Sequence, residues 1–392
     1  MRRIIGAPRD YSWGSHSALR GLCERPAPDG PLAEIWYGAH PAAPAIVTGA
    51  ETLLSMIDGD PESYLGADVG HRYAQRLPFL LKLIAPAEPL SLQVHPTLRM
   101  AQRRYADEST AGVPLNAPER NYKDANHKPE LVYALSKFEA MCGFRAPRRA
   151  AELLRGLGTP ATDALYEHLR SSPNSAGVEA AFTALFRSPP SARELAQVAG
   201  ACQQRLAGDS PSPRADRMVV LLHSKHPGDP GVVAPLLLNP VSLRPGEAVF
   251  VPAGGVHAYF SGIAVELMAA SDNVLRAGLT RKHVDVEEML ANVDYVAAPP
   301  VRIAPEVTDD ELTEVFYVPV DDFQLTVAHL IDVPRMLDGW GPRIVLCVAG
   351  EARISTGGEC EFLRPGQAVF IAAHEDEPEI SGTGRLVQAS VP

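Results

Sequence analysis

One nine-residue pattern occurs twice in the chain, as LRPGEAVFV at residues 243–251 and as LRPGQAVFI at residues 363–371. Each copy joins a Pro-Gly turn to a short apolar run, which predicts a turn that leads into a buried β-strand. Such a repeat argues for two related β-barrels in one chain. The first copy continues into Gly254-Gly255-Val256-His257, whereas the second continues into Ala372-Ala373-His374 without the glycines. We therefore expect the functional site in the first barrel and a structural role for the second.

A second informative stretch is Ser91-Leu92-Gln93-Val94-His95-Pro96, which follows the apolar run at residues 77–84. Residues two apart in a strand share a face, so Gln93 and His95 should point away from Leu92 and Val94. An imidazole and an amide that project side by side from a rigid element suit a metal site. A lone Gln-x-His is more often the polar face of a strand, so the metal hypothesis depends on the rest of the chain.

The pentapeptide Asn126-His127-Lys128-Pro129-Glu130 directly precedes an apolar run at residues 131–135. Pro129 excludes a continuous helix and suits the start or the edge of a strand. A surface loop has this composition. A strand end that opens on an active site has it too, and there Glu130 would face inward.

The segment at residues 263–283 combines a strand with a dense polar stretch. Alternation along the strand places Glu266 on the face opposite Val265 and Leu267. Asp272, Arg276 and Lys282 lie in the polar stretch that follows.

Residues 146–236 differ in texture from the rest of the chain. Alanine- and leucine-rich segments with apolar residues at helical spacing, bounded by Ser, Gly or Pro, occupy residues 150–157, 161–170, 177–186 and 192–206. These residues predict a helical insert. Residues 1–90 instead carry short apolar runs separated by Gly and Pro, which predicts an all-β sandwich or barrel.

Size and charge limit the classes of function. The 392 residues exceed what one hydrophobic core usually serves, so two or three domains are expected. The net charge of −11 argues against a nucleic-acid partner and requires a local basic pocket for any anionic substrate. Five scattered cysteines indicate reduced thiols. We find neither a signal peptide nor a run of about 18 apolar residues, so we expect a cytoplasmic protein without a membrane span.

Four motifs together resemble one family. Gln93-x-His95, Asn126–Glu130, His257-Ala258-Tyr259 and the segment at 271–280 occur in the order found in type I mannose-6-phosphate isomerases. The likeness starts near residues 11–14 and 33–36, reaches the C-terminal barrel and is weakest in the helical insert.

The resemblance implies a mainly β fold with an α-helical insert, in which two cupin-type jelly-roll β-barrels accompany a helical domain. Residues 1–145 and 237–309 would form the catalytic barrel, 146–236 the helical insert and 310–392 the C-terminal cupin-like barrel. It implies one zinc ion per chain, held by Gln93, His95, Glu130 and His257. The implied reaction interconverts mannose 6-phosphate and fructose 6-phosphate and feeds GDP-mannose metabolism.

Aldose–ketose isomerisation needs a base that moves a proton between neighbouring carbons. The candidates for this step, for ring opening and for charge stabilisation are Glu266, His127, Lys128, Asp272 and Arg276. For substrate binding they are Ser91, Lys282 and Trp13. Arg276 suits an oxyanion or a phosphate because of its planar fork. One departure is Arg281, which stands where family members commonly have proline.

Two alternatives remain at this point. A non-catalytic or differently specialised sugar-binding cupin would be expected to lose a ligand or the basic cluster. An iron oxygenase would favour two histidines and one carboxylate, and metal analysis would distinguish it. We expect a small-molecule sugar phosphate as a partner, no nucleic acid or membrane partner, and a monomer. The helical insert is a candidate lid or wall over the pocket.

Overall fold

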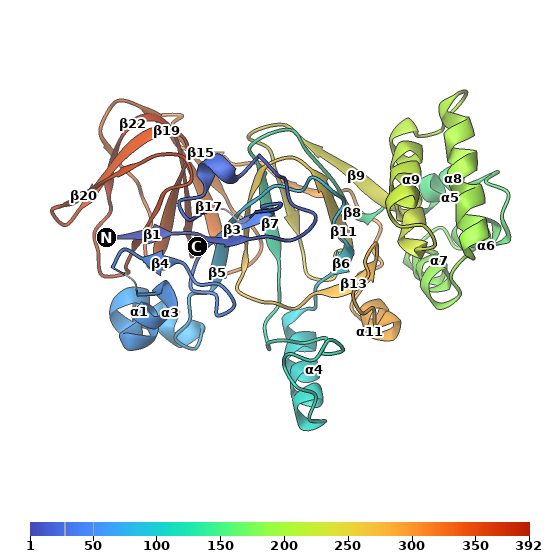
Figure 1. Ribbon diagram of the computed structural model, residues 1–392, viewed down its shortest axis with the longest axis horizontal. Coiled ribbons are helices and arrows are strands. Elements are labelled where there is room, and N and C mark those ends of the chain that lie inside the picture. Colours follow the sequence, from blue (N-terminus) through green and yellow to red (C-terminus); the bar gives the residue numbers. More distant parts are fainter. Residues whose placement is uncertain (27–28, 50) are drawn as a thin grey trace.

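The computed structural model describes residues 1–26, 29–49 and 51–392. Over these residues the protein is mostly β, with strands in three sheets and several helices (Figure 1). The sheets have ten, seven and five strands.

The seven-stranded sheet forms the middle layer. Its strands, in spatial order, are β14 (Val301–Ile303), β10 (Ala248–Val251), β7 (Glu130–Ala134), β12 (Ala264–Ala269), β5 (Phe79–Ile84), β3 (Glu34–Tyr37) and β2 (Ala7–Arg9). One face shares a hydrophobic core with the ten-stranded sheet, through Leu81, Tyr133 and Leu267 on one side and Leu325 and Ile344 on the other. The opposite face packs against the five-stranded sheet and also carries polar side chains.

The five-stranded sheet contains β13 (Leu275–Gly278), β6 (Leu92–Val94), β11 (His257–Ser261), β8 (Phe138–Phe144) and β9 (Leu238–Leu243) in spatial order. Leu92, Val94 and Ala258 pack into the core of the helical segment. Because alternate residues face opposite ways, Gln93 and His257 point toward the seven-stranded sheet. The remaining space between the two sheets is filled by a buried apolar cluster that includes Val132 and Phe138.

The ten-stranded sheet joins the two ends of the chain. Its main path is β15 (Glu306–Val307), β16 (Thr313–Phe316), β17 (Gln324–Ile331), β22 (Glu379–Ser390), β19 (Arg343–Thr356), β21 (Ala368–Ile371), β1 (Arg2–Ile5) and β4 (Ile46–Val47), with β18 (Arg335–Met336) beside β22 and β20 (Glu359–Leu363) beside β19. The N-terminal strands β1 and β4 therefore lie in the same sheet as the C-terminal strands.

The repeated nonapeptide adopts one conformation twice. Gly246 and Gly366 have φ angles of 91° and 88°, values in the left-handed region that glycine adopts without strain. In the first turn the Glu247 side chain accepts from the Arg244 amide (2.8 Å), and in the second the Gln367 side chain accepts from the Arg364 amide (2.8 Å). The strands that follow, β10 and β21, lie in different sheets. The pattern thus encodes the same turn and strand in two parts of the molecule.

A group of helices separates β8 from β9. It contains α5 (Pro147–Leu154), α6 (Pro160–Ser171), α7 (Ser175–Arg187), α8 (Ala192–Leu206), α9 (Pro213–Lys225), η2 (Pro230–Val233) and α10 (Ala234–Leu237). In Figure 1 the helices α5–α9 gather at the end of the molecule away from β1 and β22. Thr159, Asn174, Ser191 and Ser212 cap four of them by accepting backbone N–H groups. The four helices predicted from apolar spacing are confirmed.

The N-terminal region is less purely β than its sequence predicts. It contains α1 (Leu53–Gly59), α2 (Pro61–Leu65) and α3 (Ala67–Arg72), besides the short η1 (Arg20–Leu22). Thr52 forms a capping box with Ser55, and Asp60 caps α2 with Pro61 in its first turn, so local capping signals favoured helix here. Further along lie α4 (Leu98–Thr110) and α11 (Val286–Ala291). Among the described residues, no helix combines the length and apolarity needed to cross a membrane.

Candidate metal centre and active site

Three side chains converge between the seven-stranded and five-stranded sheets. Glu130 is the first residue of β7, His95 directly follows β6, and His257 begins β11. Nε2 of His95 lies 3.1 Å from Oε1 of Glu130, and Nε2 of His257 lies 3.6 Å from Oε2. The three ligand atoms lie within 4.8 Å of one another, and all three residues are buried. This is the geometry of a metal site with two imidazoles and one carboxylate.

Backbone carbonyls fix the orientation of both imidazoles. Nδ1 of His95 lies 2.8 Å from the carbonyl oxygen of Asn273, and Nδ1 of His257 lies 2.9 Å from that of Gly255. Each ring thus donates from Nδ1 and presents Nε2 to the site, as metal-binding histidines commonly do. Burial lowers the pKa of His95 to about 4 and also lowers the pKa of His257. Both rings are therefore neutral ligands at neutral pH.

The two glycines before His257 allow this approach. Gly254 has a φ of 83°, and its amide donates to the carbonyl oxygen of His95 (2.8 Å). A Cβ at this position would lie 3.1 Å from Cβ of Asp294. The turn at Gly254 therefore holds the chain before His257 against the chain after His95.

Glu130 is held as a carboxylate by its neighbours. The hydroxyl of Tyr259 donates to Oε2 (2.6 Å), and Nζ of Lys128 lies 3.0 Å from Oε1. Burial alone would raise the pKa of Glu130, but Lys128 and His95 hold it well below its usual range. An anionic oxygen therefore faces two neutral imidazoles.

The buried Nε2 atom of His95 has no hydrogen-bond partner within the described part of the chain. A buried polar atom without a hydrogen bond is costly, and a metal ion would relieve that cost. Neutral imidazole nitrogen and carboxylate oxygen are donors that zinc prefers. The residues present thus fit a zinc ion.

Gln93 lies beside these three residues. In the register of the five-stranded sheet it stands directly opposite His257 on β11 and directly opposite Arg276 on β13. Directly opposed residues share a face, so all three side chains point toward the site. The amide nitrogen of Gln93 donates to Oγ of Ser91 (3.1 Å), which brings this second predicted residue to the same place.

A buried ion pair on the same face joins the predicted Glu266 to Lys82, which sequence reasoning missed. Nζ of Lys82 on β5 lies 2.7 Å from Oε2 of Glu266 on β12. Burial alone would lower the pKa of Lys82, but Glu266 and Glu34 hold it above its usual range. Burial raises the pKa of Glu266 to about 7, against the opposing effect of Lys82. One signal was available, since Lys82 is the only charged residue in the fully buried strand Phe79–Ile84.

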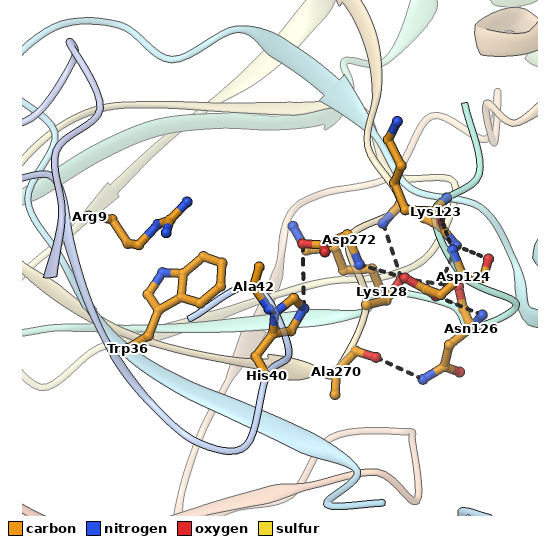
Figure 2. A network of polar contacts seen from close by, with 12 residues as sticks. Arg9, Trp36, His40, Ala42, Lys123, Asp124, Asn126, Lys128, Ala270 and Asp272 are labelled. Atoms are coloured by element: carbon orange, nitrogen blue, oxygen red, sulfur yellow. Dashed lines mark hydrogen bonds and ion pairs between the residues drawn. The ribbon is translucent and has the colours of Figure 1, made fainter. Parts of the chain in front are cut away.

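A polar network holds Asp272 at the side of the site (Figure 2). Its backbone amide donates to Oδ2 of Asp124 (2.8 Å), and its Oδ1 lies 3.4 Å from Nε2 of His40. Nδ1 of His40 accepts from the amide of Ala42 (3.2 Å). Figure 2 shows Trp36 next to His40, and their rings meet edge to face with centroids 5.0 Å apart. The Asp272 carboxylate itself is exposed.

Arg276 and Lys282 share one neighbourhood with aromatic residues. Nζ of Lys282 lies 5.9 Å from the ring centroid of Tyr11, whose ring stacks on that of Trp13 at 5.8 Å. Burial lowers the pKa of Arg276. Burial and the positive charge of Arg276 lower the pKa of Lys282. Trp13 also packs against the core between the two sheets.

His127 points elsewhere. Its Nε2 lies 2.9 Å from Oδ2 of Asp322, a residue of the loop before β17 in the C-terminal part of the chain. The structure therefore brings Lys128 to Glu130 and directs its neighbour His127 to the ten-stranded sheet.

Comparisons with known proteins agree over the whole chain. Residues 1–147 match the family model described as phosphomannose isomerase type I, catalytic domain, and residues 313–391 match the model described as mannose-6-phosphate isomerase, cupin domain. Mannose-6-phosphate isomerase of Escherichia coli (strain K12) is 37% identical over 396 residues, which cover 99% of each chain. The enzyme of that name from Rattus norvegicus is 32% identical and covers 94% of this chain and 92% of its own.

Solved structures are similar over the same length. A crystal structure of zinc-bound mannose 6-phosphate isomerase superposes with a TM-score of 0.90 at 37% identity and covers 100% of this chain and 99% of the other. A crystal structure of the protein from Salmonella typhimurium, bound to its substrate and a zinc atom, matches with the same TM-score of 0.90, identity of 37% and coverage of 100% and 99%.

Proposed function

The chain belongs to the type I mannose-6-phosphate isomerase family, and on that premise we propose that it interconverts mannose 6-phosphate and fructose 6-phosphate with one zinc ion per chain. The observation that carries this function is the convergence of His95, Glu130 and His257 on the sheet face that also holds the buried Lys82–Glu266 pair. A metal site beside a proton-transfer pair is what an aldose–ketose isomerase requires.

His95, Glu130 and His257 would hold the zinc ion, and we assign the fourth ligand to Gln93. Support for Gln93 comes from its register opposite His257 and from the Ser91 hydroxyl that orients its amide. When bound, zinc supplies a Lewis acid that polarises the carbonyl oxygen of the open-chain sugar. Tyr259 and Lys128 keep Glu130 ionised and oriented for this role.

The proton moves between neighbouring carbons through Glu266, with Lys82 beside it. A carboxyl group with a pKa of about 7 is poised to take a proton from one carbon and return it to the next. The Lys82 ammonium, 2.7 Å away, stabilises the ionised form of Glu266 and any negative charge that develops on the enediol. Both side chains are buried, so bulk water does not exchange the proton freely.

The remaining predicted residues handle the ends of the sugar. Arg276, next to Gln93 in the sheet, stabilises charge on the substrate or contacts its phosphate, and Lys282 and Ser91 also contact the phosphate. Asp272 and Lys128 act in the opening of the sugar ring. Trp13 lines the substrate site. His127 enters this scheme only as a support for its loop, because its ring nitrogen is engaged with Asp322.

We propose that the three sheets represent two cupin-type barrels with a helical insert. In this proposal the catalytic barrel comprises residues 1–145 and 237–309, the insert 146–236 and the C-terminal barrel 310–392. Strands β1 and β4 extend the sheet of the C-terminal barrel. The repeated turn supports this relationship between the barrels. The product is proposed to feed GDP-mannose synthesis in the cytoplasm, and the protein is proposed to act as a monomer.

The alternative of a non-catalytic sugar-binding cupin is not favoured, because all four proposed ligands and Arg276 are present. An iron oxygenase would use the same three ligands, so metal analysis of the purified protein accompanies the assay.

The test is a coupled isomerase assay with mannose 6-phosphate, before chelation, after it and after zinc is restored. We expect activity to vanish with the chelator and to return with zinc. Absence of activity in protein that carries stoichiometric zinc would contradict the proposed function.

A further inference from the structure

Arg9, at the end of β2, lies between two aromatic rings. Its Cζ atom is 5.0 Å from the ring centroid of Trp36 and 5.2 Å from that of Tyr11. Its Nη2 and Nε atoms donate to the hydroxyl of Tyr11 at 3.0 and 3.2 Å. Figure 2 shows the guanidinium above the indole of Trp36. Two rings and a hydroxyl thus fix the plane of this guanidinium.

Each of these rings also contacts a second cation. Nζ of Lys82 lies 5.1 Å from the Trp36 ring, and Nζ of Lys282 lies 5.9 Å from the Tyr11 ring. Followed from contact to contact, Arg9 therefore stands between the proton-transfer pair and Lys282. A substrate that reaches from Glu266 to Lys282 would have Arg9 within this chain of contacts.

The positive charges of Arg9, Arg276 and Lys282 are not neutralised by carboxylates. Within residues 1–26, 29–49 and 51–392, neither Arg9 nor Arg276 nor Lys282 forms an ion pair with a carboxylate, while Lys82 does. Glu34 stands opposite Arg9 in the sheet, but its carboxylate accepts the indole N–H of Trp36. Three cations without acidic partners create a positive field in a chain of net charge −11.

Resting on the proposed isomerase function, we propose that Arg9 is a specificity-determining residue that binds the phosphate group of the substrate together with Arg276 and Lys282. The Tyr11 hydroxyl uses only part of its donor fork, which leaves N–H groups for a phosphate oxygen. The rings that hold the guanidinium in place reduce the entropy lost when the phosphate binds.

The experiment compares Arg9→Gln and Arg9→Lys with the wild type. Its control is Arg364→Gln, which removes the same charge from an exposed residue paired with Glu351. Inorganic phosphate is the probe, used as an inhibitor of the isomerase and as a titrant in calorimetry on the zinc-loaded protein. Thermal melting and zinc content establish that each variant is folded.

For Arg9→Gln we expect about a tenfold weaker phosphate affinity and a similar rise in KM, because one charged hydrogen-bonding group is lost. We expect kcat to change much less. Arg9→Lys should fall between this variant and the wild type, and Arg364→Gln should match the wild type. Unchanged phosphate affinity in Arg9→Gln, or an equal loss in Arg364→Gln, would overturn the inference. The calorimetric titration does not depend on turnover, so an inactive wild type would contradict the isomerase function and leave the role of Arg9 measurable.

Discussion

Nζ of Lys82 on β5 lies 2.7 Å from Oε2 of Glu266 on β12, directly across the strand pair and buried on the side that faces the metal ligands. The two residues stand opposite each other in the sheet, so strand register alone brings them together. Burying both charges costs free energy that a well-packed apolar pair would not cost. The pair is therefore better explained by chemistry than by stability.

Substitution of one or both members separates these roles. Lys82→Met leaves Glu266 buried without its partner, and we expect it to reduce the free energy of unfolding by about 3–5 kcal/mol. The double variant Lys82→Met/Glu266→Leu should recover most of that loss, because two apolar side chains replace the pair. Both variants should be inactive. Chemical denaturation and the isomerase assay on the same preparations measure the two effects, and a double variant that recovers activity with stability would contradict a chemical role.

The pH dependence follows from Glu266. Its pKa is raised to about 7 by burial, and it acts as a base only when ionised. Activity should therefore rise with pH as Glu266 loses its proton, with the midpoint of kcat/KM near pH 7. His95, with its pKa lowered to about 4, stays neutral through this range and does not produce the rise in activity. In Glu266→Gln the rate should fall by about a hundredfold or more, and the rise in kcat/KM near pH 7 should disappear. A wild-type profile that is flat between pH 5 and pH 8, with zinc content constant, is the result that this assignment does not allow.

Much of the site was predictable because its residues lie in short motifs beside apolar strands. Alternation predicted that Gln93 and His95 share one face of a strand, whereas a surface loop stayed open for Glu130. The set of four ligands came from the family resemblance, and the structure brings His95, Glu130 and His257 together. Lys82 was not predicted as a site residue, although its position in a buried strand was visible in the sequence. No local pattern reveals which acidic residue it will meet across the sheet. Arg9 and Tyr11 were missed for the same reason. Arg9 meets Trp36 only when β2 pairs with β3, and Tyr11 meets Lys282, which lies about 270 residues further along the chain. The short helices at residues 53–72 were missed because their capping residues were outweighed by the surrounding β texture.

Tyr259→Phe tests how the metal ligand Glu130 is held. The change removes the hydroxyl that donates to Oε2 at 2.6 Å and leaves the ring in place. We expect zinc affinity to fall by about 10–100-fold, as for other residues that orient a metal ligand, with smaller effects on kcat at saturating zinc. Competition with a coloured chelator measures the affinity. Tyr295→Phe, whose hydroxyl bonds to the carbonyl oxygen of Leu290, is the matched control and should bind zinc normally.

Arg276→Lys keeps the charge and removes the planar fork. If Arg276 stabilises charge on the substrate, kcat should fall by about tenfold to a hundredfold while the fold is retained. The neighbouring change Arg281→Pro restores the residue that the family commonly has and alters an exposed position. We expect it to leave kcat within about twofold, as for other surface substitutions. Equal losses in both variants would indicate a general disturbance of this loop.

The contact between His127 and Asp322 predicts coupling between two distant parts of the chain. His127 lies in the loop that ends at Glu130, and Asp322 lies in the loop before β17, so their 2.9 Å contact ties the site loop to the ten-stranded sheet. If His127 acts only through this contact, His127→Ala and Asp322→Ala should give the same loss of kcat/KM. The double variant should then be no worse than either single variant, with a coupling energy of about 0.5–3 kcal/mol. If His127 instead handles the sugar ring directly, His127→Ala should cost far more than Asp322→Ala, and the two effects should add. Steady-state kinetics on the three variants, with zinc content measured for each, therefore decides whether His127 touches the substrate or holds the loop that does.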